Sequence, residues 1–160
     1  MIAFTVRGKT VTISLDDALL TAETWYINSN GYVVDNGSGI YAMQRLHRVV
    51  MARVLGRGLE CWELVDHING DKLDNRRENL RLATSSENAF NCDLPAHNTT
   101  GYKGVYRNTY QSGPKPWQAA ITVNRKKIYL GSYATAVEAA RAYQQAACQY
   151  AGEFYREATR

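Results

Sequence analysis

The segment VDHINGDKLDNRRENLRLATSSEN, residues 65–88, constrains the fold of this 160-residue chain more than any other. Its polar turn at residues 69–71 follows a short apolar run, which predicts a short hairpin or an Ω-like excursion. Residues 84–87, Thr-Ser-Ser-Glu, form a capping box, so a short helix should begin there and carry Asn88 in its first turn. The segment therefore gathers an Asp-His pair and several asparagines around one small unit of strand, turn and helix.

Charge is distributed unevenly along the chain. The formal charge of +4 and the pI of about 9.0 suit a polyanionic partner, but such values are as common in proteins that bind none. Residues 98–160 hold nine Lys or Arg against three Asp or Glu, a net of +6, whereas residues 1–97 hold ten against twelve, a net of −2. The positive charge thus belongs to the C-terminal part, and the length allows one or two domains.

The three cysteines, Cys61, Cys92 and Cys148, are far apart and show no Cys-x-x-Cys spacing, so they support neither a disulfide framework nor a zinc ribbon. The N-terminal residues alternate between apolar and polar, and no apolar run approaches the ~18 residues of a membrane-spanning helix. We therefore expect reduced thiols and a cytoplasmic protein without membrane contact, in the host cell cytoplasm if a phage encodes it.

Local patterns predict an α+β chain that begins with a small β layer. Alternation over residues 2–15 predicts two strands, and the runs at residues 25–27 and 32–34 predict a second pair. Apolar residues at helical spacing predict a helix over about 42–55, which Gly56 ends. These elements, with a core at about 62–92, would form a first domain over residues 1–95.

A second domain is expected over residues 101–155. The aperiodic stretch at residues 91–100 lies where the charge balance changes sign, and we place a linker at residues 96–100. Three β-like runs follow, at 102–107, 117–123 and 127–130. A helix over about 136–150 begins with a capping box, and its alanine-rich face predicts close packing on a sheet.

The residues in the middle segment suit phosphodiester hydrolysis, which needs a base for water, a cation for the developing charge and ligands for that cation. A histidine, a carboxylate and asparagine oxygens could supply the base and an oxygen-rich site for Mg²⁺ or Mn²⁺. Adjacent residues on a regular strand point to opposite faces, so Asp66 and His67 share one site only if the strand twists or bulges. Alternatively, the pair is structural, and Asn75, Asn79 and Asn88 serve turns and a helix cap.

These residues resemble the HNH nuclease motif in its phage and intron homing-endonuclease form. The resemblance is carried by Asp66-His67, by Asn79 in Glu-Asn-Leu, by Asn88 after a glutamate, and by the lead-in Leu-His-Arg at residues 46–48. It extends back to Trp25 and covers roughly the first 95 residues.

The resemblance implies a ββα-metal finger with assigned roles. His67 would be the general base, Asp66 and Asn88 would hold the divalent ion, and Asn79 would bridge the loop and orient His67. An asparagine replaces the final histidine of the motif, which favours a hard ion, Mg²⁺ first and Mn²⁺ second, over zinc. His47 and Arg48 are candidate phosphate contacts, although His47 could equally pack in the core.

The C-terminal part resembles the AP2 DNA-binding domain of plant factors and phage homing endonucleases, through GYKGVYRN, WQAAI and YLGSYATAVEAARAYQQAA. The likeness implies a three-stranded antiparallel sheet packed on one helix, with the open sheet face on DNA. Tyr106, Asn108, Ala120 and Thr122 depart from the plant pattern, so no plant target sequence carries over. Alternatively, the aromatic side chains are core and the cations a solvated face. The expected DNA-binding residues are Lys103, Arg107, Trp117, Arg125, Lys126, Lys127 and Tyr129.

Together these features predict a metal-dependent endonuclease that hydrolyses phosphodiester bonds in double-stranded DNA, as a site-preferring nicking or homing-type enzyme. The expected ends are 5′-phosphate and 3′-hydroxyl, and a monomer is favoured. One alternative is a non-catalytic DNA-binding regulator on a nuclease-derived scaffold. Another is a protein that acts on RNA.

Overall fold

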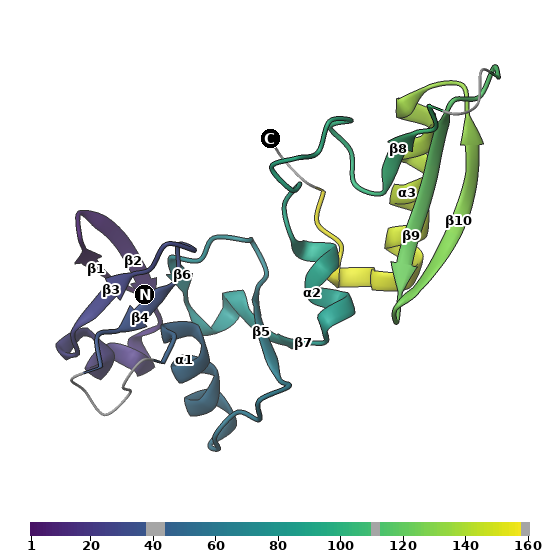
Figure 1. Ribbon diagram of the computed structural model, residues 1–160. Coiled ribbons are helices and arrows are strands. Elements are labelled where there is room, and N and C mark those ends of the chain that lie inside the picture. Colours follow the sequence, from purple (N-terminus) through teal and green to yellow (C-terminus); the bar gives the residue numbers. More distant parts are fainter. Residues whose placement is uncertain (38–43, 110–112, 158–160) are drawn as a thin grey trace. The chain divides into compact units, whose positions relative to one another are not determined.

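The computed structural model describes residues 1–37, 44–109 and 113–157 (Figure 1). The chain divides into two compact units, Met1–Ala83 and Thr84–Arg160, each with its own small sheets and helices. The mixed α and β content predicted from the sequence is therefore confirmed. Among the described residues, no helix is both long and apolar enough to cross a membrane.

The first unit begins with the predicted hairpin of strands β1 (Ile2–Val6) and β2 (Lys9–Ile13), which pair antiparallel. Arg7 and Gly8 in its turn have positive φ angles of +48° and +79°. A two-residue hairpin loop of this kind requires a positive φ at both central residues. Strand β6 (Asp74–Asn75) joins the other edge of β2 in parallel. This two-residue strand was not predicted, and it brings the end of the polar loop against the N-terminal hairpin.

A second two-stranded sheet consists of β3 (Trp25–Ile27) and β4 (Val33–Asp35), close to the predicted bounds. An unpredicted 3-10 helix, Leu15–Ala22, precedes it, and the indole of Trp25 donates a hydrogen bond of 2.7 Å to the carbonyl of Leu20. This bond satisfies the one polar atom of a buried aromatic side chain.

Helix α1 (Leu46–Leu55) buries one apolar stripe in the core of the first unit. Gly56 ends it at φ +66°, as its sequence position predicted. The helix begins at Leu46, later than predicted, because Arg45 is extended and forms a β-bridge with Val34. Residues 42 and 43 of the predicted span lie outside the described ranges. Around the helix the core contains Val6, Val11, Ile13, Leu20, Trp25, Val33, Leu46, Val49, Val50, Met51, Val65 and Leu80.

The polar segment forms two antiparallel strands, β5 (Leu64–His67) and β7 (Leu80–Ala83), joined by the loop that contains β6. A single 3-10 turn, Arg77–Asn79, leads into β7. The register sets Asp66 opposite Arg81 and His67 opposite Leu80. The candidate Asp-His pair therefore ends a strand that is fixed in the core by Val65 and Leu80.

Helix α2 (Ser85–Asn91) begins the second unit with the predicted capping box. The hydroxyl of Thr84 accepts from the amide of Glu87, and the Glu87 carboxylate accepts from the amide of Thr84. Phe90 of this helix is 4% exposed and packs with Ile121 and Ala147. The boundary between the two units thus lies between Ala83 and Thr84, because burial of Phe90 joins α2 to the second core. The sequence instead suggested a linker at 96–100.

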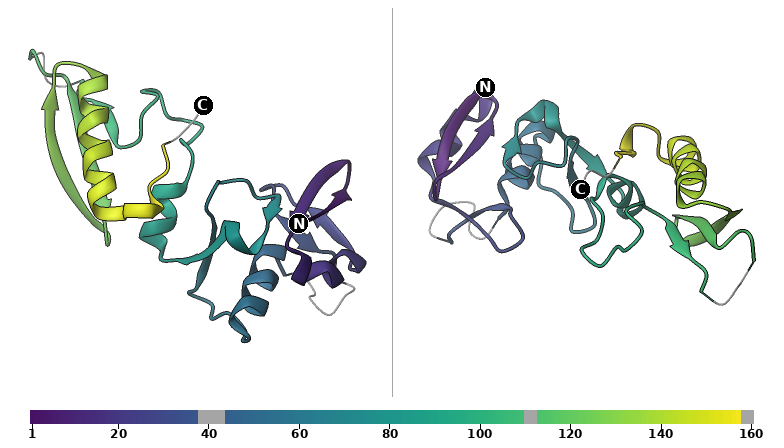
Figure 2. Two further views of the ribbon diagram at one scale, coloured as in Figure 1. Left: turned by 180° about the vertical axis from the view of Figure 1, so that it is seen from behind. Right: turned by 90° about the horizontal axis from the view of Figure 1, so that it is seen from above.

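The rest of the second unit is an antiparallel sheet in the order β10-β9-β8 with helix α3 (Ala136–Ala151) against one face (Figures 1 and 2). The strands are β8 (Val105–Arg107), β9 (Trp117–Val123) and β10 (Lys126–Tyr133). A 3-10 turn, Gly152–Phe154, follows α3.

Close packing in this unit requires a glycine beside the sheet. A Cβ at Gly104, which has φ +63°, would overlap the ring of Tyr143 and the carbonyl of Ala120. The turn before β8 therefore approaches α3 more closely than any other residue type would allow.

Candidate active site

A cluster of three rings surrounds the end of β5. The ring of His67 lies 4.9 Å from that of His47 on α1, and both histidines are at most 5% exposed. The ring of Tyr32, just before β4, lies 5.1 Å from His47 and 6.2 Å from His67. Three segments that are distant in sequence thus form one aromatic wall around the candidate base.

Asn75 holds the imidazole of His67. Its Oδ1 lies 3.3 Å from Nε2 of His67, and its amide donates to the carbonyl of Lys72, also at 3.3 Å. An amide oxygen only accepts, so this contact favours the tautomer that has the proton on Nε2 and the lone pair on Nδ1. Asn75 is fully buried on β6. Sequence reasoning assigned it only to a turn, because the pairing of β6 with β2 leaves no local pattern.

Asn79 bridges the loop between β5 and β7. Its Oδ1 accepts from the amide of Asn69, and its Nδ2 donates to Asn69 Oδ1 and to the Asp74 carbonyl at 2.7 Å. Its own carbonyl accepts from the amide of Ile68 at 2.8 Å. Asn79 thus accepts hydrogen bonds from the backbone of Ile68 and Asn69, the two residues that follow His67. The hydrogen bond to the imidazole comes from Asn75 instead.

Asp66 is ion-paired within the β5–β7 ladder. Its Oδ2 accepts from Nε of Arg81 at 3.0 Å and lies 2.9 Å from the second guanidinium nitrogen, with both side chains largely buried. A pair with two guanidinium nitrogens fixes the rotamer of the carboxylate. A cation at Asp66 would therefore share the carboxylate with Arg81, which sequence reasoning did not foresee.

The expected metal ligands are a carboxylate and an amide, from Asp66 and Asn88. Asn88 lies on α2 in the second unit. Within the described ranges, no group of three His, Cys, Asp or Glu side chains is arranged to hold an ion. One buried carboxylate with amide oxygen and water nevertheless fits a hard, partly hydrated cation such as Mg²⁺ by its donor chemistry.

Both histidines favour the neutral form. Burial lowers the pKa of His47 to about 3, with further contributions from His67 and the nearby cations Arg45 and Arg48. Burial also lowers the pKa of His67, although the Asn75 hydrogen bond and the carboxylate of Asp66 act in the opposite direction. A neutral His67 can accept a proton at neutral pH. Nδ1 of His47 is buried without a hydrogen-bond partner among the described residues.

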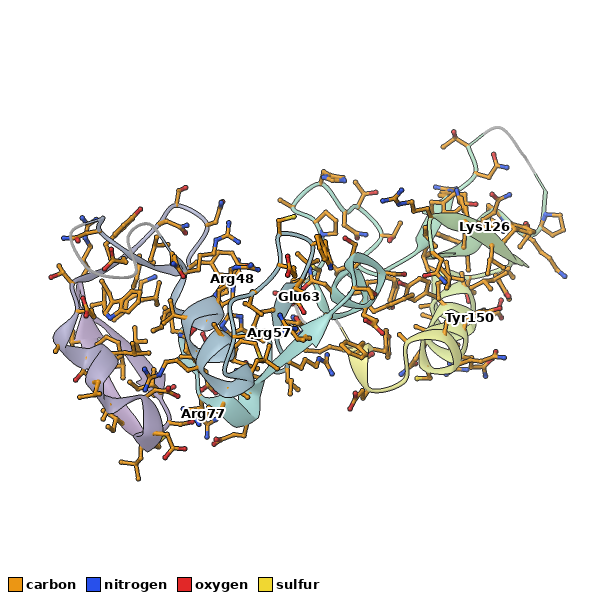
Figure 3. The ribbon with its side chains drawn as sticks, turned by 90° about the horizontal axis from the view of Figure 1, so that it is seen from below. Arg48, Arg57, Glu63, Arg77, Lys126 and Tyr150 are labelled. Carbon is orange, nitrogen blue, oxygen red and sulfur yellow. The ribbon has the colours of Figure 1, made fainter. Side chains whose placement is uncertain are left out.

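Arg48, a predicted phosphate contact, is engaged inside the first unit. Its guanidinium donates to the carbonyls of Glu63 at 2.6 Å and Glu60 at 3.2 Å. Arg57 forms an ion pair of 2.6 Å with the carboxylate of Glu63, and Figure 3 shows Arg48, Arg57 and Glu63 close together. Arg48 thus ties the chain after α1 to the helix, and the structure gives it this role in place of an open cation.

In the second unit, the cross-strand register separates two faces of the sheet. Ala119 and Ile121 are buried towards α3, whereas Tyr106, Lys127 and Tyr129 share the other face. Nζ of Lys127 lies 4.8 Å from the ring centroid of Tyr106, and Tyr129 is 56% exposed. This face carries exposed aromatic and cationic groups together.

The β9–β10 turn adds two further cations. Arg125 and Lys126 are exposed, and Asn124 and Arg125 both have positive φ, +49° and +65°. Lys126 is labelled in Figure 3. Both predicted phosphate contacts therefore lie at the solvent end of the hairpin.

Two other predicted DNA-binding residues are engaged within the second unit. Nζ of Lys103 donates to the carbonyls of Phe90 at 2.8 Å and Arg156 at 2.9 Å, and burial lowers its pKa. Trp117 packs against the cluster of Val105, Ala119 and Ala139 and has the Arg107 guanidinium 5.9 Å from its ring. The structure thus gives Lys103 and Trp117 structural roles, while Arg107 stays exposed.

The middle segment matches a known family. Residues 44–90 match the family model described as HNH endonuclease. An HNH endonuclease family domain thus lies at residues 44–90. The match includes α1, the β5–β7 ladder and all but the last residue of helix α2, and so spans all four residues that the motif predicted. No solved structure matches the chain.

The relatives are viral proteins and a plant protein. An uncharacterized HNH endonuclease of Acanthamoeba polyphaga mimivirus is 29% identical over 149 residues, 92% of the chain and 74% of that protein. Protein 3.8 of Escherichia phage T7 is 35% identical over 81 residues, 44% of the chain and 64% of that protein. An ethylene-responsive transcription factor of Arabidopsis thaliana is 34% identical over 94 residues, 56% of the chain and 55% of that protein. The chain thus spans less than two thirds of the phage and plant relatives.

Proposed function

We propose that this protein is a metal-dependent endonuclease of double-stranded DNA, of the site-preferring nicking or homing type. The observation that carries the proposal is His67, a neutral imidazole whose Nε2 is held by Asn75 at the end of a strand, inside the segment that matches the HNH endonucleases. One such site in each chain favours a nick.

In this mechanism His67 acts as the general base. Its Nδ1 accepts a proton from the attacking water, and Asn75 stabilises the imidazolium that forms. Asp66 and Asn88 would hold the divalent ion, Mg²⁺ or alternatively Mn²⁺, which would supply stabilisation of the negative charge that develops on the phosphate and on the leaving 3′ oxygen. Asn79 holds the loop closed. The products carry 5′-phosphate and 3′-hydroxyl ends.

DNA affinity comes mainly from the second unit, in an AP2-like manner. Its net charge is positive, and its open sheet face combines Lys127 with Tyr106 and Tyr129, beside the cationic turn at Arg125 and Lys126. Cations neutralise phosphates while flat side chains cover sugars and bases, so this face suits a nucleic-acid backbone. The similarity to a plant transcription factor supports this assignment.

The test is conversion of supercoiled plasmid to nicked circle in Mg²⁺ or Mn²⁺, with and without chelator. We expect His67→Ala to abolish cleavage and to leave DNA affinity nearly unchanged. His97→Ala is the matched control, because His97 is exposed and outside the HNH-matched residues. Full activity of His67→Ala would contradict the role of the base. Parallel incubation with structured RNA tests action on RNA.

The second candidate is a DNA-binding regulator without catalytic activity. The ion pair between Asp66 and Arg81 favours it, because a carboxylate occupied by a guanidinium is a weaker ligand for a cation. This alternative predicts site-specific binding by the wild type, no nicking with any divalent metal, and no change in binding when chelator is added.

A further inference from the structure

Five of the ten Lys and Arg side chains of the first unit are ion-paired with carboxylates. Arg53 and Arg77 share the buried carboxylate of Asp17, and three further ion pairs join Arg57 to Glu63, Arg76 to Asp74, and Arg81 to Asp66. The unit holds ten Asp or Glu and ten Lys or Arg. A cation of this unit that has no carboxylate partner is therefore a candidate contact for an external anion.

Arg45 and Lys72 are the unpaired cations beside the candidate base. Among the described residues neither has a carboxylate within 4 Å, and the three undescribed segments contain no Asp or Glu. Three other cations of the unit have no described carboxylate partner. Arg7 and Lys9 belong to the exposed β1–β2 turn, and Arg48 donates to two backbone carbonyls. Arg45 and Lys72 instead come from two separate segments and meet at one ring.

That ring is Tyr32. The guanidinium carbon of Arg45 and the ammonium nitrogen of Lys72 each lie 4.7 Å from its centroid. The same ring lies 6.2 Å from that of His67. Lys72 is further positioned by a hydrogen bond of 2.8 Å from its ammonium to the carbonyl of Asn30. Two fixed positive charges thus converge on the aromatic wall that lines the candidate active site.

A purely structural role explains this arrangement poorly. Tyr32 is half-buried, a cation on such a ring contributes about 0.5–2 kcal/mol, and two like charges on one ring repel each other. Arg45 and the neighbouring Arg48 also act to lower the pKa of His47, the buried histidine beside Tyr32. An anion bound between Arg45 and Lys72 would relieve the repulsion.

We propose that Arg45, Lys72 and Tyr32 form a subsite for a backbone phosphodiester of the DNA strand that enters the active site. The proposal deepens the proposed function and rests on it. Arg45 and Lys72 neutralise the phosphate, and the face of Tyr32 supports the adjoining sugar. The subsite brings the strand to His67, whereas the second unit supplies the remaining affinity.

The test compares two double variants with equal loss of charge. Arg45→Gln with Lys72→Gln removes the subsite, and Arg7→Gln with Lys9→Gln is the matched control from the same unit. Fluorescence anisotropy on a short duplex in chelator gives the affinity at several salt concentrations. Each lost phosphate contact lowers the slope of log affinity against log salt by about 1, so we expect a decrease of about 2 for the subsite variant and none for the control.

Plasmid cleavage in Mg²⁺ by the same variants adds a second readout. We expect KM to rise for the subsite variant and kcat to stay near that of the wild type. Equal salt slopes for the subsite and control variants, with both folded by circular dichroism, would overturn the subsite. A lower slope for the subsite variant, together with a wild type that never cleaves DNA, would support the subsite and refute the nuclease.

Discussion

Replacement of Asn75 by leucine tests how the active site controls its base. The side chain is fully buried and supplies the acceptor for Nε2–H of His67 at 3.3 Å. A leucine of similar size keeps the packing and removes the acceptor. The buried N–H then lacks this partner, which costs about 1–3 kcal/mol and removes the preference for a proton on Nε2. Since about 1.4 kcal/mol is tenfold in a population, kcat should fall by about 10- to 100-fold.

The assay is single-turnover nicking of plasmid, together with DNA affinity in chelator, which should not change. Two-bond ¹H–¹⁵N correlation spectra of the histidine rings should show the Nε2–H form of His67 in the wild type and a mixture in Asn75→Leu. Asn75→Asp keeps the acceptor and should keep the tautomer. Its added carboxylate raises the pKa of His67, so the acid limb of the rate profile should move to higher pH. Wild-type kcat and an unchanged tautomer in Asn75→Leu would refute the reasoning.

Three further predictions concern stability. Phe90→Ala should destabilise the second unit by about 3–5 kcal/mol in urea unfolding, because Phe90 is 4% exposed in its core; an unchanged second transition would contradict the placement of α2. Gly104→Ala should lower the melting temperature of the same unit more than Gly101→Ala does. Gly101 is the control because it also has a positive φ but has open space for a Cβ. Equal decreases in melting temperature would argue against the overlap with Tyr143. Because burial holds the folded pKa of His47 at about 3, below its unfolded value of 6.5, stability is complete above pH 6.5 and falls by as much as about 4 kcal/mol towards pH 3. His47→Phe should flatten that dependence in pH-resolved thermal melts.

Local sequence patterns were sufficient for elements whose cause is local. Alternation predicted the β1–β2 hairpin, Gly56 predicted the end of α1, and both capping boxes start helices. The 3-10 helix at Leu15–Ala22 and the strand β6 were missed. Strand β6 has two residues and exists because β2 pairs with it, so its cause lies about 60 residues away in the sequence.

The candidate site shows the same division. Motif spacing singled out His67 and Asn79, and the structure brings both to the loop between β5 and β7. It could not predict Asn75 on the imidazole or Arg81 on Asp66, because each contact depends on the register of a strand pair. Lys103 stays a predicted DNA contact. The sequence could not show that its ammonium donates to the Phe90 and Arg156 carbonyls, because these partners are distant along the chain.

The position of α2 has a consequence for the exchange of DNA-binding modules between such proteins. A chimaera cut at residues 96–100 would leave Phe90 without the core that buries it and would remove the Lys103 ammonium from the end of α2. A cut between Ala83 and Thr84 respects both cores, but it divides the segment that matches the HNH endonucleases. A new targeting module would then arrive with its own α2 and its own residue at position 88, so selection for a new target would act on a predicted metal ligand at the same time.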